Sequence, residues 1–368
     1  MTSLRFKRIH ASPRRNKQAG VALITVLLVF AIATLIASKI IIGKVLDVQR
    51  TTGMINRTQA YYYAVAAEEL TILALEENAN ADADPDNMPQ GDHLDEFWAQ
   101  GPIPFEIDNI GAVLVQIIDL NRYYNINNII QSDGKVSLHE LDRFKDLLIE
   151  LNLDESIADN LADWLDADNS EQGYQSEKDG YLNEQPGYLA ANRMLSDISE
   201  LRLVRGFTPE VMNLLNGHIT VVKRPGVLPL NMNTASEYAL STLQVAAGAG
   251  NSGSYNGIGI SGAQDIIGAR ITPYTDLPDV ASRVGISNLQ SNSVVNTGTI
   301  KTGPGDPLST YTVSSDIFEV HIRASYAGSV AYLSTTIAQQ GAGTFAKFVV
   351  LQRKETDNSA HFINAASN

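Results

Sequence analysis

The sequence contains no cysteine in its 368 residues. No disulfide framework can therefore hold the fold together, and a cysteine nucleophile is excluded. The chain also lacks a Gly-x-Ser-x-Gly nucleophile elbow and a Gly-x-x-x-x-Gly-Lys phosphate loop. His139-Glu140 lacks the second histidine of a zinc-binding helix. Because no catalytic constellation is recognisable, we expect a protein that is not an enzyme.

Acidic residues are absent from the first twenty positions, which carry six basic residues: Arg5, Lys7, Arg8, Arg14, Arg15 and Lys17. No charged residue occurs from Val21 to Ser38, and apolar residues resume after Lys39. At about 1.5 Å per residue this run is long enough to cross a bilayer core as a helix. The basic start keeps the N-terminus cytoplasmic. Because no A-x-A cleavage site follows the run, we expect a retained single-pass anchor, with the later residues outside the cytoplasm.

The chain is acidic overall, with 41 aspartates and glutamates against 27 lysines and arginines and a formal net charge of −14. If the basic leader is removed, the charge of the mature chain falls to −20. Such a surface repels phosphate backbones and suits the binding of cations.

The helix of the apolar run is predicted to continue outward from Val45 to Asn78, since this stretch has no proline and only Gly53 as a glycine. Helical spacing places a set of apolar residues on one face of this helix: Tyr61, Tyr62, Ala64, Ala67, Leu70 and Leu73. The acidic run from Glu76 to Asp86 then ends the helix and is typical of a solvated loop.

Residues 112–120 predict a strand, and three further strands are predicted at 316–326, 329–338 and 345–352. Between the first strand and the others, short helical patterns dominate from about residue 125 to 300. The clearest are at 138–151, 156–165, 196–204 and 208–215. We therefore expect an α+β protein, in which a small sheet is interrupted by a large helical insertion.

The junction of the basic leader with Gly20-Val21-Ala-Leu-Ile-Thr25 resembles the leader of type IV pilins and type II secretion pseudopilins. The resemblance implies that a prepilin peptidase cuts after Gly20 and that the new N-terminus, Val21, is methylated. Most such subunits have glutamate at the fifth mature position, where this chain has Thr25. A subunit with nothing assembled above it needs no such carboxylate, so Thr25 is expected in a tip subunit. The alternative is that Thr25 is simply a tolerated replacement of the glutamate, with no bearing on the position of the subunit.

Several ordered motifs resemble the family of general secretion pathway protein K, a minor pseudopilin. They are Asp119 to Asn128, Asp163 to Asp168, Tyr188 to Arg193, Glu200 to Gly206 and Leu230 to Ala235. The glycine- and serine-rich segments 246–262 and 287–305 depart from the family pattern and are interpreted as insertions. The family implies a leader at 1–20, a spine helix and first part of a pilin-like domain at 21–124, an inserted all-α domain at 125–310, and sheet-completing strands at 311–368.

The same resemblance implies a subunit of the inner membrane, with its C-terminal domain in the periplasm and later at the tip of the pseudopilus. Its partners would be the minor pseudopilins of types I and J. The predicted subunit interface includes Thr25, Tyr61, Tyr62 and Leu70.

The acidic stretch from Asp166 to Asp179 resembles a calcium-binding loop. If Asp166 is counted as position 1, then Asp168, Ser170 and Glu177 fall at positions 3, 5 and 12, which is the ligand spacing of an EF-hand loop. Glu171 occupies the position where an EF-hand has glycine, so the match is partial. The protein K family holds calcium in this region. By position, the resemblance implies the ligand set Asp166, Asp168, Glu177, Asp179 and Asn192, with a solvated acidic loop as the alternative.

Two alternatives for function stay open. Residues 230–243 and 266–270 resemble paired helix-hairpin-helix repeats, which bind DNA through backbone amides and basic residues. The hairpins lack a cluster of lysine and arginine, so we interpret the likeness as one of fold and expect no nucleic-acid partner. A minor pilin of a type IV pilus would share the leader and spine, but usually not the inserted domain.

Overall fold

The computed structural model describes residues 19–82, 91–107, 110–167, 178–183, 185–246, 255–286, 310–341 and 346–356. Residues 1–18 of the predicted leader, residues 247–254 of the first glycine- and serine-rich segment and the whole of the second, 287–305, lie outside these residues. The chain divides into two compact units, Met1–Gln59 and Ala60–Asn368, and each is described by itself.

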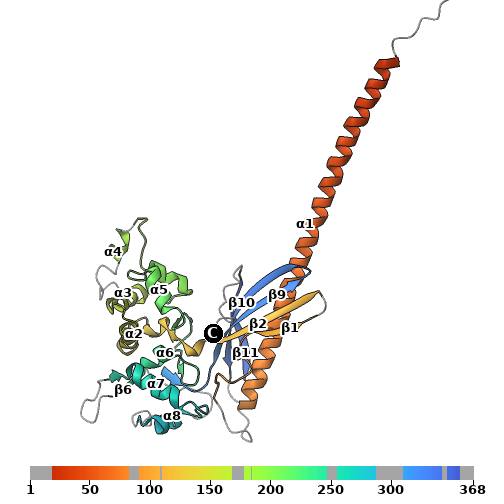
Figure 1. Cartoon of the computed structure of the whole chain (residues 1–368). Coiled ribbons are helices and arrows are strands. Elements are labelled where there is room, and N and C mark those ends of the chain that lie inside the picture. The colour runs from red at the N-terminus through yellow and green to blue at the C-terminus, as the bar shows by residue number, and fades with distance from the viewer. Residues whose placement is uncertain are drawn as a thin grey trace, which may run out of the picture. The chain divides into compact units, whose positions relative to one another are not determined.

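The long helix α1, Ala19–Asp82, contains 64 residues and has no proline (Figure 1). The predicted helix is confirmed and runs four residues beyond Asn78. Up to Gln59 nearly all its apolar side chains are exposed; Val21, for example, is 64% exposed. From Ala60 onward one face of α1 is buried, and this later part of the helix belongs to the second unit.

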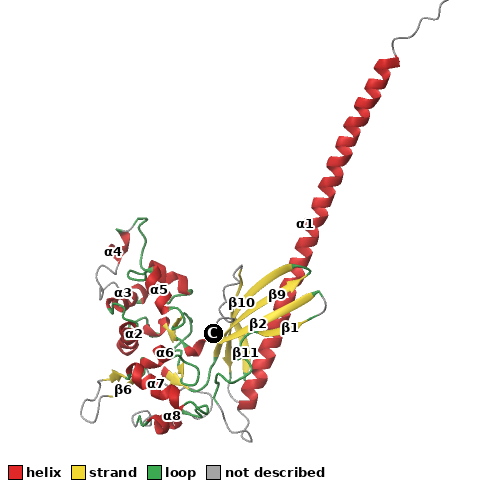
Figure 2. Ribbon diagram, in the orientation of Figure 1, coloured by secondary structure: helices red, strands yellow, loops and turns green. Residues whose placement is uncertain are grey.

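A five-stranded antiparallel sheet forms part of the second unit, in the order β1-β2-β9-β10-β11 (Figure 2). Its strands are β1 Ile103–Glu106, β2 Gly111–Asp119, β9 Ile317–Tyr326, β10 Ser329–Gln340 and β11 Lys347–Thr356. The four predicted strands are confirmed within a few residues. β1 was not predicted, because Pro104 argues against a central strand; the structure accommodates this proline on an edge strand.

The sheet is interrupted in sequence between β2 and β9, which nevertheless pair directly, with Asp119 opposite Phe318. This confirms the predicted insertion, although the residue boundaries of the predicted domains remain predictions. The core lies between α1 and one face of the sheet. Ala64, Ala67 and Leu75 of α1 belong to the same buried cluster as Val115 and Val320. The alternation of side chains along β2 provides this apolar face.

Helices dominate the region between β2 and β9. They are α2 Leu138–Glu150, α3 Ser156–Leu165, α4 Lys178–Leu182, α5 Pro209–Leu215, α6 Glu237–Ser241, α7 Gly259–Ala269 and α8 Leu277–Val284. Three 3₁₀ helices accompany them: η1 Leu120–Arg122, η2 Ile126–Ile129 and η3 Ile198–Leu203. The predicted helices 138–151, 156–165 and 208–215 are confirmed, whereas 196–204 contains a 3₁₀ helix.

Short strand pairs also occur in this region: β3 Tyr124–Asn125 with β4 Ile219–Thr220, β5 Leu230–Asn231 with β8 Tyr311–Thr312, and β6 Gln244–Ala246 with β7 Tyr255–Gly257. Two hydrophobic clusters lie wholly in this region, one around α2 and α3 and another around α6, α7 and α8, and a smaller cluster joins Leu120, Val222 and Leu228 to Ile317 of β9. The region is therefore mainly helical and built in two parts.

A buried asparagine joins the helical region to the sheet. The Oδ1 atom of Asn121 accepts hydrogen bonds from the backbone amides of Asp316 and Ile317, each at 3.1 Å. Its Nδ2 donates to the carbonyl of Pro229 at 3.0 Å. One amide thus fixes the chain where it leaves β2, where it returns to β9, and where the second helical part begins.

Candidate assembly surface and metal loop

The predicted apolar face of α1 is two faces in the structure. Ala64 and Ala67 are buried against the sheet, whereas Tyr62, Leu70 and Leu73 are about 60% exposed. An α-helix turns about 100° per residue, so Tyr62 and Leu73 lie on the far side of α1 from Ala64 and Ala67, whereas Leu70 lies about 60° from Ala67, at the edge of the exposed side. The prediction of one face was wrong. We call the exposed residues Tyr62, Leu70 and Leu73 the outward stripe.

Tyr61, another predicted interface residue, lies between these two faces. Its side chain is half-buried and packs against the helix-sheet core, and its ring meets that of Tyr62 edge to face with 5.9 Å between centroids. Of the predicted interface residues in the second unit, Tyr62 and Leu70 are therefore the ones that present their side chains outward.

Glu68 fastens the buried face of α1 to the sheet. Its side chain is fully buried, and its Oε2 accepts hydrogen bonds from Thr335 Oγ1 at 2.5 Å and from Arg353 Nε at 2.9 Å. The same hydrogen-bonded carboxylate raises the pKa of Arg353 above its ordinary value. Eight residues later on the same helix, Glu76 Oε1 accepts a hydrogen bond from the backbone N–H of Phe348 at 3.0 Å. Sequence reasoning missed both contacts, because a glutamate on a long helix is normally solvated.

The processing site predicted at Gly20 and Val21 lies at the start of α1. The first unit contains the one segment, among the residues that the structure describes, that is long and apolar enough to span a membrane, with a mean hydropathy of 2.7. Thr25 lies within this segment, and its hydroxyl donates to the carbonyl of Ala22 at 2.9 Å. The hydroxyl is thus satisfied inside the helix.

Two of the five predicted calcium ligands are brought together at the end of α3. Asp166 is the C-cap of α3 and is 2% exposed. Asn192 has a left-handed backbone, with φ of 45°, and its backbone N–H donates to the backbone carbonyl of Trp164 at 3.0 Å. Asp168 and Glu177 lie outside the described residues. Asp179 lies in α4, where only the backbone is described. The calcium site therefore stays a prediction.

Trp164, next to the acidic loop, is a core residue. It is 2% exposed, and its ring meets those of Tyr181 and Tyr188 edge to face, with centroids 5.0 and 6.1 Å apart. Burial raises the pKa of Tyr181 to about 12. An aromatic cluster thus supports the end of α3 from which the loop departs.

A second group of acidic residues lies where α1 ends, and sequence reasoning did not identify it. Carboxylate oxygens of Asp82, Asp92 and Glu96 lie within 4.8 Å of one another, close enough to hold a metal ion or to share protons. Burial, followed by the charge of Glu96, raises the pKa of Asp82 to about 6. The same two causes raise the pKa of Asp92 well above its usual range, although its Oδ2 accepts a hydrogen bond from the Ser315 amide at 2.6 Å.

The turn between β7 and α7 lies, in sequence, between the two segments that resemble helix-hairpin-helix repeats, and it faces acidic side chains of α2. A Cβ atom added at Gly257 would lie 2.8 Å from Asp146 Oδ2, and one added at Gly259 would lie 3.1 Å from Glu150 Oε1. Burial raises the pKa of Asp146. The backbone of this turn therefore lies close to carboxylates of the same chain, which do not favour a phosphate there.

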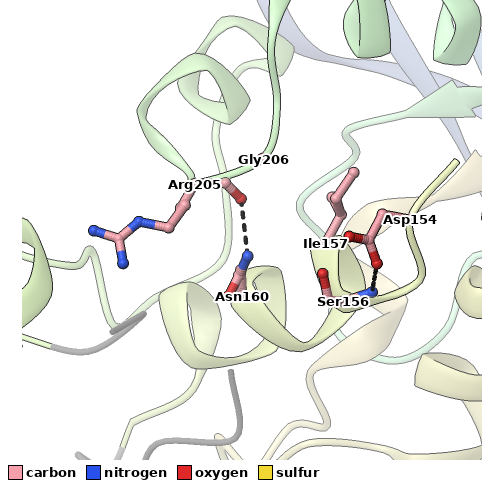
Figure 3. A pocket seen from close by; sticks show the side chains of 6 residues that line it. All are labelled: Asp154, Ser156, Ile157, Asn160, Arg205 and Gly206. Carbon is pink, nitrogen blue, oxygen red and sulfur yellow. Dashed lines mark hydrogen bonds between the residues drawn. The ribbon is translucent and has the colours of Figure 1, made fainter. Parts of the chain in front are cut away.

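A cavity of about 400 Å³ lies between α3 and the turn before α5 (Figure 3). Asn160 Nδ2 donates to the carbonyl of Arg205 at 3.2 Å, and Asp154 Oδ1 accepts from the Ser156 amide at 2.9 Å. Figure 3 shows the guanidinium of Arg205 pointing away from Asp154. These residues form no pair of nucleophile and base, so the geometry provides no catalytic arrangement here.

Comparison with known proteins decides the family. The family model for protein K of the type II secretion system matches residues 123–224. The type II secretion system protein K of Pseudomonas aeruginosa is 38% identical over 234 residues, which cover 62% of this chain and 69% of that protein. This chain belongs to the protein K family. The protein K of Pectobacterium carotovorum is 31% identical over 61% of this chain and 69% of that relative.

A solved structure shows the same fold. The crystal structure of the GspK-GspI-GspJ complex from the enterotoxigenic Escherichia coli type 2 secretion system contains a chain with a TM-score of 0.62 and 20% identity. The match covers 84% of this chain and all of the other. The sequence-based recognition of the protein K family and the predicted α+β fold are therefore confirmed. The family match begins at Tyr123, just after the chain leaves β2, and includes the described ends of the acidic loop.

Proposed function

We propose that this chain is a minor pseudopilin that caps the tip of the type II secretion pseudopilus and nucleates its assembly with the minor pseudopilins of types I and J. The observation that carries the proposal is the outward stripe on α1 of a protein K family member. The similar solved chain is described in a complex with I and J subunits. An exposed apolar stripe opposite a buried helix face suits packing against helices of other subunits.

The N-terminal segment supports assembly from a membrane. We infer removal of residues 1–20 by the prepilin peptidase, methylation of Val21, and a single-pass inner-membrane state with the second unit in the periplasm. The basic leader and the exposed apolar helix support this arrangement. Thr25 supports a place at the tip, because it provides no carboxylate to pair with the terminal amine of a subunit above. The inserted helical region adds bulk that a filament shaft would not accommodate.

The outward stripe allows a direct test of assembly. The full chain is expressed with its I and J partners, extracted from membranes, and recovered through a tag on this chain. Replacing Tyr62 and Leu70 with alanine is expected to abolish recovery of the partners without lowering the melting temperature of the chain alone. Leu138→Ala is the matched control, since Leu138 is 70% exposed on α2. Undiminished recovery with the α1 variant would contradict the proposed interface.

We also propose that the loop from Asp166 to Asp179 binds calcium, with Asp168, Glu177 and Asn192 completing the ligand set. The burial of Asp166 and the tie between Asn192 and the end of α3 support this, since rigid oxygen ligands favour a hard cation. The cysteine-free chain has no disulfide to stabilise this region. Calcium is expected to raise the melting temperature of the full chain with saturation, and chelation to reverse the rise.

Two loop variants and a matched control make the calcium test specific for this loop. Asp168→Asn and Glu177→Gln should remove the response, whereas Glu155→Gln, which removes an exposed acid beside α3, should retain it. An unchanged calcium response in both loop variants would exclude this loop as the site.

DNA binding in an uptake filament is the less supported alternative. The carboxylates of Asp146 and Glu150 lie against the glycines at the turn between β7 and α7 and would repel a phosphate there. The net charge of −14 acts in the same direction. Membership of the protein K family likewise favours a secretion pseudopilus over a type IV pilus.

A further inference from the structure

Two half-buried arginines stand out in this acidic protein, because neither has a carboxylate within ion-pair distance among the residues that the structure describes. Arg122 ends η1, and Arg270 is the C-cap of α7. Neither forms an ion pair within the described residues, and buried nitrogens of both, Arg122 Nε and Arg270 Nη1, have no hydrogen-bond acceptor. Buried guanidinium nitrogens without acceptors carry a desolvation cost. Arg143 provides a contrast, since its fully buried guanidinium donates to Glu140 at 3.0 Å and to Thr242 Oγ1 at 3.2 Å.

Hydrogen bonds bring the two arginines to the same corner of the fold. Arg270 Nη2 donates to the carbonyl of Ala235 at 3.0 Å. The neighbouring Thr234 donates through its hydroxyl to Asp119 Oδ2 at 2.5 Å, and Asp119 lies three residues before Arg122. The charge of Arg122 contributes, after burial, to lowering the pKa of Arg270. Two positive charges are therefore held near each other by the fold.

The buried carboxylate of Asp119 forms no ion pair with either arginine among the described residues; burial raises its pKa to about 6, and the charge of Arg122 is among the causes that lower it. Asp119 is fully buried, and its two oxygens accept hydrogen bonds from Thr234 Oγ1 and from the amide of Asn121 at 2.7 Å. It lies beyond ion-pair distance of Arg122. Arg122 instead lies over the ring of Tyr123, 5.4 Å from its centroid, which restricts the plane of the guanidinium.

We propose that Arg122 and Arg270 form a binding site for an oxyanion, at the corner between the end of β2 and the end of α7. Guanidinium groups recognise carboxylates and phosphates through paired N–H donors, and two of them in one corner of the fold can share a single anion. The ligand is either a carboxylate side chain of another protein or a free inorganic anion, and the test distinguishes these sources. The site lies outside the outward stripe and the acidic loop, so it is independent of the proposed assembly contact.

The experiment measures the melting temperature of the full chain in detergent against rising phosphate and, separately, rising acetate, at constant ionic strength. A saturable rise is expected with at least one of the two anions. Saturation with acetate alone would assign the site to carboxylates, whereas saturation with phosphate would assign it to an inorganic anion. In Arg122→Gln, the affinity for the effective anion should fall by at least about tenfold.

Two variants separate binding from structure. Arg202→Gln is the matched control, because Arg202 is exposed and removing it changes the net charge equally. It should keep the full response. The side chain of Arg122 makes no hydrogen bond to the residues that the structure describes, and its contact with the Tyr123 ring is half-exposed, so without anion Arg122→Gln should melt close to the parent chain. A response that never saturates, an equal response in Arg122→Gln and the parent, or a markedly lower anion-free melting temperature in Arg122→Gln would overturn the proposal.

Discussion

The two parts of α1 satisfy their polar side chains in different ways. In the first unit, Thr25, Thr34 and Thr51 donate to carbonyls three or four residues back in the same helix. In the second unit Thr71 does the same, but Glu68 and Glu76 bond to strands more than two hundred residues later in the chain. The first part is therefore complete as a helix without tertiary contacts of its own, and its apolar surface is left for lipid or other subunits. The second part is one wall of a folded core.

The largest expected effect comes from breaking the tie between α1 and the sheet. Glu68→Ala leaves Arg353 and Thr335 without their shared acceptor, and should lower the free energy of unfolding by about 3 kcal/mol. Urea unfolding of the full chain in detergent measures the change. Glu77→Ala removes an exposed glutamate from the same helix and should have little effect. Equal losses in the two variants would show that Glu68 does not hold α1 to the sheet.

Packing on the buried face gives the next largest effect. Ala67 is 7% exposed and faces the sheet, so Ala67→Leu should overpack the core and destabilise the chain by about 2 kcal/mol. Ala66, the adjacent residue, is exposed, and Ala66→Leu should leave the unfolding free energy unchanged. The same urea titration compares them. A neutral Ala67→Leu would mean that this face is not closely packed in solution.

Much of the fold follows from patterns within one element. The alternation in β2 and β9 predicts half-buried strands, and Ser137 caps α2 at the place where its helical pattern starts. The continuity of α1 follows from the absence of proline. These features depend on neighbours in sequence, which a single sequence displays directly.

Other features depend on residues far apart in the chain. The small side chains of Ala64 and Ala67 let α1 pack closely against the sheet, whereas the large side chains of Tyr62 and Leu70 are exposed. Helical periodicity does not tell a buried alanine from an exposed tyrosine or leucine, so periodicity alone assigns all of them to one face. The sequence around Glu68 gives no sign that its carboxylate accepts hydrogen bonds from Thr335 in β10 and Arg353 in β11, because these strands follow more than two hundred residues later. The acidic group around Asp82 and the pair of Arg122 with Arg270 likewise join separate segments, and no spacing rule connects their members.

A smaller effect is expected from pH at the end of α1. The pKa of Asp82 is raised to about 6, and that of Asp92 is also raised well above its usual range, so the folded chain binds protons more tightly than the unfolded chain. The free energy of unfolding should therefore rise as the pH falls from about 7.5 to about 5.5, by about 1 kcal/mol after allowance for solvent screening.

Melting temperatures across this range test the sign. Asp82→Asn should flatten the profile and stabilise the chain at the upper end. Asp197, whose pKa is lowered to about 2 by its hydrogen bond with Lys354, should lose its contribution only at much lower pH. A profile that falls on acidification, or one unchanged by Asp82→Asn, would contradict this account.

The smallest effect is expected at Thr25, where the comparison between the two parts of α1 is sharpest. Its hydroxyl is already bonded to Ala22 in its own helix, so Thr25→Val should change neither membrane insertion nor recovery with the I and J partners, and stability should shift by less than about 0.5 kcal/mol. Thr25→Glu is the informative counterpart, since a carboxylate in the membrane costs about 3 kcal/mol unless it is paired. Membrane fractionation and partner recovery measure both variants. If Thr25→Val reduced recovery while Leu23→Val did not, the hydroxyl would have to bond to another chain, and the first part of α1 would be less self-sufficient than its internal hydrogen bonds indicate.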